Sequence, residues 1–217
     1  MGDEDEERVL PTEYSLVPEG GEKKLPTSTG FTGRAVASYT NGDVYEGPFE
    51  NGIRQGQGKY TYFSGDVFTG TFENNLKTGK GRVVYKKGGF YHGFFKDGVR
   101  DGEGTFKYAN GDIYSGLWKG GKRQGPGTYV FAVTKYEYKG EWKDGQITEG
   151  TWTLTDGTQY EGRFKDQKPC GAGVWRTRQG TVVSGTHTQE VVPVQAPLPA
   201  TATRTSWTTA GMAAAAA

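Results

Sequence analysis

The stretch NGDVYEGPFENGIRQGQGKY, residues 41–60, places an aromatic-x-Gly-x-aromatic string and a Gly-x-Gly string on either side of an Asn-Gly pair. Asn-Gly between alternating residues is a strong local signal for an antiparallel hairpin. Pairing Gly47 with Gly58 sets Tyr45 opposite Tyr60, and since strand side chains alternate, all four share one face. The stretch therefore predicts a hairpin with an aromatic face and a polar face.

The same register sets the second ring of the hairpin, Phe49, against Gly56, with residues 51–54 as the loop. A ring opposite a missing side chain can lie across the backbone and shield a strand glycine. Glycine is thus expected to be a packing residue. The corresponding pairs expected elsewhere are Phe95 with Gly102, Trp118 with Gly125, Phe164 with Gly171, Trp142 with Thr148, and, on the polar face, Glu46 with Lys59 and Lys96 with Asp101.

Six copies of this unit follow one another at spacings of 23, 23, 23, 24 and 22 residues. Half units flank them, one from Gly33 and one from Val183. Terminal repeats of an array are commonly atypical because they cap it. The units begin at Tyr45, Phe68, Tyr91, Tyr114, Tyr138 and Tyr160.

The string YEGPFENGIRQGQGKY and its copies resemble MORN repeats, whose pattern is Tyr-x-Gly-x-(Trp/Phe) followed by Gly-x-Gly. The resemblance covers residues 31–187. It implies an all-β fold, an elongated solenoid of successive antiparallel β-hairpins that forms one twisted open sheet, with a groove lined by aromatic rings.

Composition and charge divide the chain into three parts. Residues 1–30 carry eight acidic and three basic side chains, whereas residues 31–185 carry 22 basic and 16 acidic ones. We predict an acidic, extended N-terminal arm over residues 1–30, the MORN-repeat array over 31–187, and a flexible tail rich in Thr, Pro and Ala over 188–217. Apolar residues make up 33% of the chain, but 36 glycines at regular spacing argue against disorder of the array.

Two sets of residues are expected to matter. The paired glycines should be structural, and a bulky side chain at any of them should disrupt the sheet locally; they are Gly47, Gly58, Gly70, Gly81, Gly93, Gly104, Gly116, Gly127, Gly140, Gly150, Gly162 and Gly173. The rings should hold the array together and line a partner-binding groove; they are Tyr45, Phe49, Tyr60, Phe72, Tyr91, Phe95, Phe106, Tyr114, Trp118, Tyr129, Tyr138, Trp142, Trp152, Tyr160, Phe164 and Trp175.

The sequence does not predict an enzyme. His92 and His187 have no Cys or carboxylate at metal-ligand spacing, and Cys170 has no basic partner nearby. The Gly-x-Gly strings lack the third glycine and the Lys-Ser or Lys-Thr of nucleotide-binding loops. We expect no catalytic residue, metal or cofactor. Interleaved acidic residues also argue against nucleic-acid binding.

Two functional classes remain. Residues 127–151, GTYVFAVTKYEYKGEWKDGQITEGT, resemble the MORN subunits of cilia and flagella, especially the radial spoke head type. This resemblance implies a scaffold in the axoneme, at the radial spoke or the central apparatus, that supports motility with other structural proteins as partners. Localisation would be cytoplasmic and cytoskeletal. Exposed edge strands at the array ends could also pair in a homodimer. The alternative is a phospholipid-binding adaptor at a membrane surface, which should show a basic stripe or an anchor.

Overall fold

The computed structural model describes residues 10–193 and 201–210. These residues form 17 strands and no helix, in one open antiparallel sheet of successive hairpins. The predicted all-β fold is therefore confirmed. The chain divides into two compact parts, Met1–Ala109 and Asn110–Ala217. We call them the N-terminal half and the C-terminal half, and we keep the word unit for the repeat.

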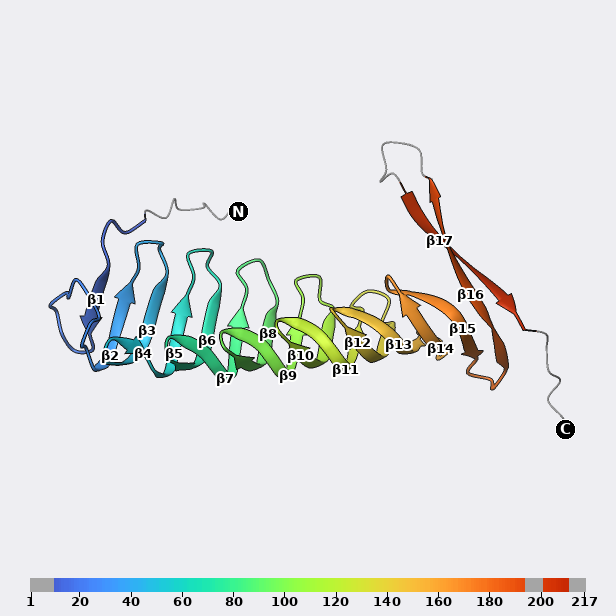
Figure 1. Ribbon diagram of the computed structural model, residues 1–217, viewed down its shortest axis with the longest axis horizontal. Helices are drawn as coiled ribbons and strands as arrows, with labels where there is room; N and C mark the ends of the chain where they lie inside the picture. The colour runs from blue at the N-terminus through green and yellow to red at the C-terminus, as the bar shows by residue number, and fades with distance from the viewer. Residues whose placement is uncertain (1–9, 194–200, 211–217) are drawn as a thin grey trace. The chain divides into compact units, whose positions relative to one another are not determined.

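The strands of the N-terminal half are β1 (Ser15–Pro18), β2 (Gly33–Ser38), β3 (Val44–Glu50), β4 (Ile53–Arg54), β5 (Gly56–Thr61), β6 (Val67–Glu73), β7 (Leu76–Val84), β8 (Phe90–Lys96) and β9 (Val99–Lys107). In this half successive strands pair in chain order, except that β4 and β5 are two parts of one return strand and both pair with β3 (Figure 1).

In the C-terminal half each strand also pairs with the strand that follows it (Figure 1). The strands of this half are β10 (Ile113–Lys119), β11 (Lys122–Val130), β12 (Glu137–Lys143), β13 (Gln146–Thr153), β14 (Gln159–Lys165), β15 (Lys168–Arg176), β16 (Val182–Pro193) and β17 (Thr201–Thr209).

The register near the paired glycines is as predicted. Tyr45 lies opposite Tyr60, and Glu46 lies opposite Lys59, to which it is bonded at 2.8 Å. The same alignment holds in the later units, where Tyr91 faces Phe106, Tyr114 faces Tyr129, Tyr160 faces Trp175, and Gly140 faces Gly150.

The predicted register at the hairpin tips is wrong. The connection is a two-residue turn, Asn51-Gly52, with φ of 48° and 83°, rather than a four-residue loop. Positive φ at both positions matches the twist of the flanking strands. Phe49 consequently lies opposite Arg54, not Gly56.

Because the turn is shorter than predicted, the strand after it is longer, and a β-bulge accommodates the added residues. In the third unit the register shifts between Gly93 and Phe95, and Gly102 adopts a φ of 96°, which favours glycine. The observed partners of the second ring and its neighbours are therefore Phe95 with Arg100, Trp118 with Arg123, Phe164 with Pro169, Trp142 with Ile147, and Lys96 with Val99.

In the repeats that begin at Tyr45, Phe68, Tyr91, Tyr114 and Tyr160, the ring that shields the glycines is the first ring, not the second. In the fifth repeat main-chain atoms lie nearest to Gly140 and Gly150. A Cβ added to Gly47 would lie 2.7 Å from Cζ of Tyr45 and 2.9 Å from Cα of Gly58. The Tyr45 ring thus lies across the glycine pair, and its hydroxyl donates to the carbonyl of Pro48 at 3.0 Å. We call the face that carries Tyr45 and its equivalents the ring face.

The C-terminal hairpin extends this arrangement beyond the repeats. Gly185 in β16 has no aromatic residue two positions before it, and the indole of Trp207 in β17 covers it instead. Trp207 also packs on His187, with ring centroids 4.5 Å apart. Burial lowers the pKa of His187, which sits between Trp207 and Tyr160.

Strands lie in both segments that flank the predicted array. β1 falls in the predicted arm, and β16 and β17 fall largely in the predicted tail. Main-chain bonds between Leu16 and Leu25, at 2.8 and 2.9 Å, cover the outer edge of β1. The outermost residues of both segments, 1–9 and 211–217, lie outside the described residues, and the three boundaries stay predictions.

Gly93→Ala is expected to lower the free energy of unfolding by about 2 to 3 kcal/mol, the cost of overpacking a close contact. The added Cβ would lie 2.5 Å from the Tyr91 hydroxyl and 2.6 Å from the carbonyl oxygen of Glu103. Urea unfolding measures the change. Gly21→Ala is the matched control, because its Cβ would meet nothing closer than 3.4 Å; equal losses in both variants would contradict close glycine packing.

The buried tyrosines should make the protein sensitive to alkali. Burial, partly offset by Arg100, raises the pKa of Tyr91 to about 12. Stability from the neutral ring is present below the unfolded pKa of about 10 and is lost as pH rises towards 12. Phe68 fills the same place in the preceding unit, so Tyr91→Phe should fold and shift the alkaline unfolding midpoint upward. An unchanged midpoint in circular dichroism would argue against this origin.

Candidate partner-binding surface

The first and second rings of every unit are buried and do not form a surface. Tyr45 and Tyr91 are fully buried, and the most exposed member of the set, Tyr138, is 7% exposed. Within a unit the two rings meet edge to face, as Tyr45 and Phe49 do at 5.1 Å between centroids. Such pairs stabilise the sheet. The predicted residues in this group are Tyr45, Phe49, Phe72, Tyr91, Phe95, Tyr114, Trp118, Tyr138, Trp142, Tyr160 and Phe164.

The third ring, which every repeat but the second carries, lies at the surface of the ring face; the second repeat has the buried Val83 there. The third rings are half-buried and part of each is accessible; they are Tyr60, Phe106, Tyr129, Trp152 and Trp175. Among the predicted rings, they are the ones that a partner can reach.

A buried aspartate orients the third ring in two of the units. Asp43 accepts hydrogen bonds from the Tyr60 hydroxyl at 2.7 Å and from the Phe63 main chain at 2.8 Å. Asp112 holds Tyr129 in the same way at 2.6 Å. Burial alone would raise the pKa of Asp112, but hydrogen bonds from Tyr129, Ala132 and Asn110 outweigh burial and hold it below its usual value. Hydrogen bonds thus orient the Tyr60 and Tyr129 rings in the free protein.

The N-terminal half also carries a row of half-buried rings that was not predicted, two residues after the position of the third ring in each repeat. In the chain these are Tyr39, Tyr62, Tyr85 and Tyr108. Tyr60 and Tyr62 lie 4.8 Å apart, and Tyr85 stacks on Phe106 at 5.3 Å. The signal for them is the alternation of rings in YTY, residues 60–62, and in FKY, residues 106–108.

A row of cations beneath these rings was not predicted either. The row follows the hairpin turns at 23-residue spacing, with each cation opposite the second ring of its repeat; its members are Arg54, Lys77, Arg100 and Arg123. The signal is a basic residue two positions after the two-residue turn in each of the first four repeats. The predicted loop over residues 51–54 had placed Arg54 outside the paired strands.

Arg54 is held in a cage of rings. Its guanidinium carbon lies 5.1 Å from the centroid of Tyr60 and 5.5 to 5.7 Å from those of Tyr39, Tyr45 and Phe72. It donates to the Asn75 carbonyl at 3.0 Å and to the Tyr39 hydroxyl at 3.4 Å, while its buried Nε has no acceptor. Cation–π attraction of this kind contributes roughly 0.5 to 2 kcal/mol.

Lys77 occupies the equivalent place one unit later. Its ammonium lies 5.5 to 5.7 Å from the centroids of Tyr62, Phe68 and Phe95, and it donates to the Tyr62 hydroxyl at 3.1 Å. Arg54 and Lys77 line one hollow of about 170 Å³. Tyr60, Tyr62, Phe72, Asn75, Leu76 and Gly98 complete its wall.

The fold does not require these cations. In the fifth and sixth repeats the residues at the same register position are Ile147, opposite Trp142, and Pro169, opposite Phe164, and both are buried. The fourth repeat still carries a cation there, Arg123, opposite Trp118 and 4.5 Å from the ring centroid of Trp142. The residue just before this position differs as well. Ile53, Leu76 and Val99 are 38 to 47% exposed in the N-terminal half, whereas Lys122, Gln146 and Lys168 take their places in the C-terminal half. The N-terminal half therefore combines caged cations with an exposed apolar residue beside each of them.

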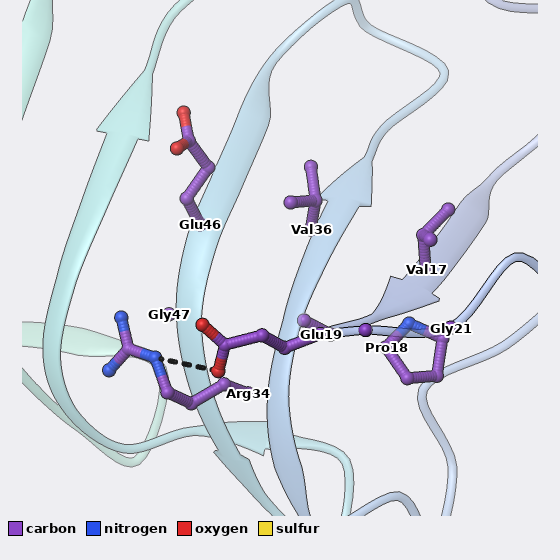
Figure 2. Close-up of a pocket in the computed structure, with 10 residues that line it drawn as sticks. Val17, Pro18, Glu19, Gly21, Arg34, Val36, Glu46 and Gly47 are labelled. Carbon is purple, nitrogen blue, oxygen red and sulfur yellow. Dashed lines mark ion pairs between the residues drawn. The ribbon is translucent and has the colours of Figure 1, made fainter.

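A second hollow, of about 320 Å³, lies over β1 to β3 and is drawn in Figure 2. Val17, Pro18, Val36 and Gly47 form part of its wall. Across it Arg34 is paired with Glu19 at 3.5 Å, and both side chains are more than half exposed. Its one cation is already paired, so this hollow is the weaker candidate.

Within residues 10–193 and 201–210, no group of three or more His, Cys, Asp and Glu side chains could hold a metal ion. His92 is exposed on β8 and Cys170 is a half-buried free thiol. The described part of the chain contains no helix that is long and apolar enough to cross a membrane.

This geometry defines a class: a β-hairpin repeat protein with one aromatic face. The MORN repeat family model matches residues 45–67, 68–90, 91–113, 114–133, 138–148 and 160–182, more than half of the chain. The protein belongs to the MORN repeat family, a generally non-catalytic family of repeats typical of scaffold and binding proteins.

Comparison with the curated proteins gave no match. Among solved structures, one similar chain is the SAS-4 (dCPAP) TCP domain of Drosophila melanogaster, in complex with a proline-rich motif of Ana2 (dSTIL). It is 15% identical, with a TM-score of 0.44, over 71% of this chain and 84% of that one.

Lys77→Met should change the free energy of unfolding by no more than about 1 kcal/mol, the usual worth of one cation–π contact. Methionine keeps the apolar stem that packs on the rings, and Ile147 shows that the position tolerates an uncharged residue. Urea unfolding tests this, with Lys96→Met on the opposite face as control. A loss above about 2 kcal/mol would make Lys77 a structural residue.

Proposed function

We propose that this protein is a non-enzymatic scaffold whose MORN array binds segments of partner proteins within a large assembly. The observation that supports the proposal is the surface of the N-terminal half, where half-buried rings, caged cations and exposed apolar side chains occur together. Ring faces with orienting polar groups and an arginine are typical of the centres of protein interfaces. The fold itself does not call for this composition.

The assembly that we propose is the axoneme of a cilium or flagellum, at the radial spoke head or the central apparatus, with a role in motility. The support is the resemblance of residues 127–151 to ciliary MORN subunits. Partners would be other structural proteins. Location in the cytoskeleton of the cilium is part of the same proposal.

Fractionation of cilia from the source organism tests the assembly. Cilia are separated into a detergent-soluble membrane fraction, a salt extract and the residual axoneme, and the protein is quantified in each. Retention in the axoneme through detergent is the expected result. Release with the membrane fraction would favour a phospholipid-binding adaptor instead, and absence from cilia would refute the axonemal role.

Matched variants test the surface. In cells that express only the variant, Lys77→Glu should lower the amount retained in the axoneme at least threefold, because it reverses a charge in the hollow. Lys96→Glu, on the exposed polar face of β8, should be retained like the unaltered protein. Equal retention of both variants would remove the hollow from the partner-binding surface.

A further inference from the structure

We propose that the hollow formed by Arg54 and Lys77 binds carboxylates, and that its occupant in the free protein is the chain's own acidic segment, residues 3–7. This docking goes beyond the scaffold function and does not depend on it, because it concerns one chain alone. It would make the N-terminal segment an internal competitor for the ring face.

The two cations have no acidic partner among the described residues. Carboxylates of the N-terminal half pair with other cations: Glu46 pairs with Lys59, and Glu19 pairs with Arg34. Partly burying a cation without a counter-charge is unfavourable unless another group offsets the lost hydration. The rings offset part of that loss, and a carboxylate would offset more.

Donor capacity remains at both cations. A guanidinium has five N–H groups and an ammonium three. Arg54 uses two bonds, to Asn75 and Tyr39, and Lys77 uses one, to Tyr62. The cage of rings fixes the guanidinium, so a carboxylate that enters meets a donor that is already oriented. Leu76 adds an exposed apolar wall, 47% accessible, for the stem of an acidic side chain.

The acidic segment is DEDEE, Asp3 to Glu7, the longest uninterrupted run of like charge in the chain. Its structure lies outside the described residues, but the point where it leaves them is known. The side chain of Leu10 lies over Gly42, where an added Cβ would be 3.0 Å from both Leu10 Cδ2 and Phe63 Cγ. The segment therefore starts beside the turn that carries Phe63.

That starting point is close to the hollow. Tyr62 is the chain neighbour of Phe63 and accepts the hydrogen bond of Lys77. Tyr14, further along the arm, packs on Tyr39 at 5.6 Å, the ring that accepts from Arg54. The arm thus runs along the ring face. Three to seven residues, the separation of Glu7 to Asp3 from Leu10, span at most about 10 to 25 Å, enough to reach Lys77.

The test is paramagnetic broadening within the full chain. A spin label is attached at Gly2→Cys in a Cys170→Ser background, and the backbone amide signals of Tyr62, Leu76 and Lys77 are followed. At about 0.01 M salt, where screening is weak, their intensities should at least halve. At about 1 M salt, where charges separated by more than about 3 Å are screened, the intensities should recover.

Two variants separate docking by charge from chance proximity. Neutralising the segment (D3N, E4Q, D5N, E6Q and E7Q) should restore the intensities without touching the folded array. Arg54→Gln with Lys77→Gln should restore them as well. The matched control, Lys80→Gln with Arg82→Gln, removes two exposed charges from β7 and should leave the broadening in place.

Several outcomes would overturn the proposal. They are full intensities in the unaltered chain at low salt, equal broadening after the segment is neutralised, and recovery in the Lys80 and Arg82 control. Broadening that disappears on tenfold dilution would assign the segment to a second copy of the chain, and it would also contradict docking within one molecule. None of these results bears on axonemal retention, so the two proposals fail separately.

Discussion

The structure depends on the close approach of paired glycines under an aromatic ring. Gly93 and Gly104 face each other across the ladder, and the Tyr91 ring lies over both. A side chain at either glycine would push the ring off the sheet and expose the backbone beneath it. Since each unit buries little aliphatic surface, ring-on-glycine contact supplies the packing that a second layer of structure supplies in most sheets. Trp207 on Gly185 shows that the contact matters more than its source in the chain.

The β-bulge beside each glycine pair determines where function can reside. Without it, Phe95 would face Gly102 and the basic residue would lie in the hairpin loop. With it, Gly102 takes a positive φ, the turn tightens to Asp97-Gly98, and Arg100 moves opposite Phe95. The cation is thereby brought under the rings. A small backbone irregularity, paid for once per unit by a glycine, converts a solvated charge into an oriented donor.

Much of this could be predicted from the sequence, and the failures have physical causes. The repeat spacing and the pairing of Tyr45 with Tyr60 followed from alternation and turn residues. The bulge did not, because a glycine such as Gly56 reads the same whether it pairs or adopts positive φ. Burial separated the first two rings from the third, yet all are aromatic at similar spacing. Pairing of β17 with β16 is set by contacts that no local pattern in a Thr-rich segment encodes.

A repeat protein contains its own controls, which is why the difference between its units is informative. Ile147 and Pro169 hold the same register position as Arg54 and Lys77, so the backbone accepts an apolar residue there. An apolar residue avoids the desolvation of a cation and packs as well. Cation–π attraction offsets part of that cost, at Arg54 and Lys77 and also at Arg123 of the fourth repeat. What distinguishes the N-terminal half is the exposed apolar residue, such as Leu76, just before each cation. Arg54 and Lys77 also keep N–H donors beyond those that Asn75, Tyr39 and Tyr62 occupy, and these donors are what the proposed carboxylates would meet.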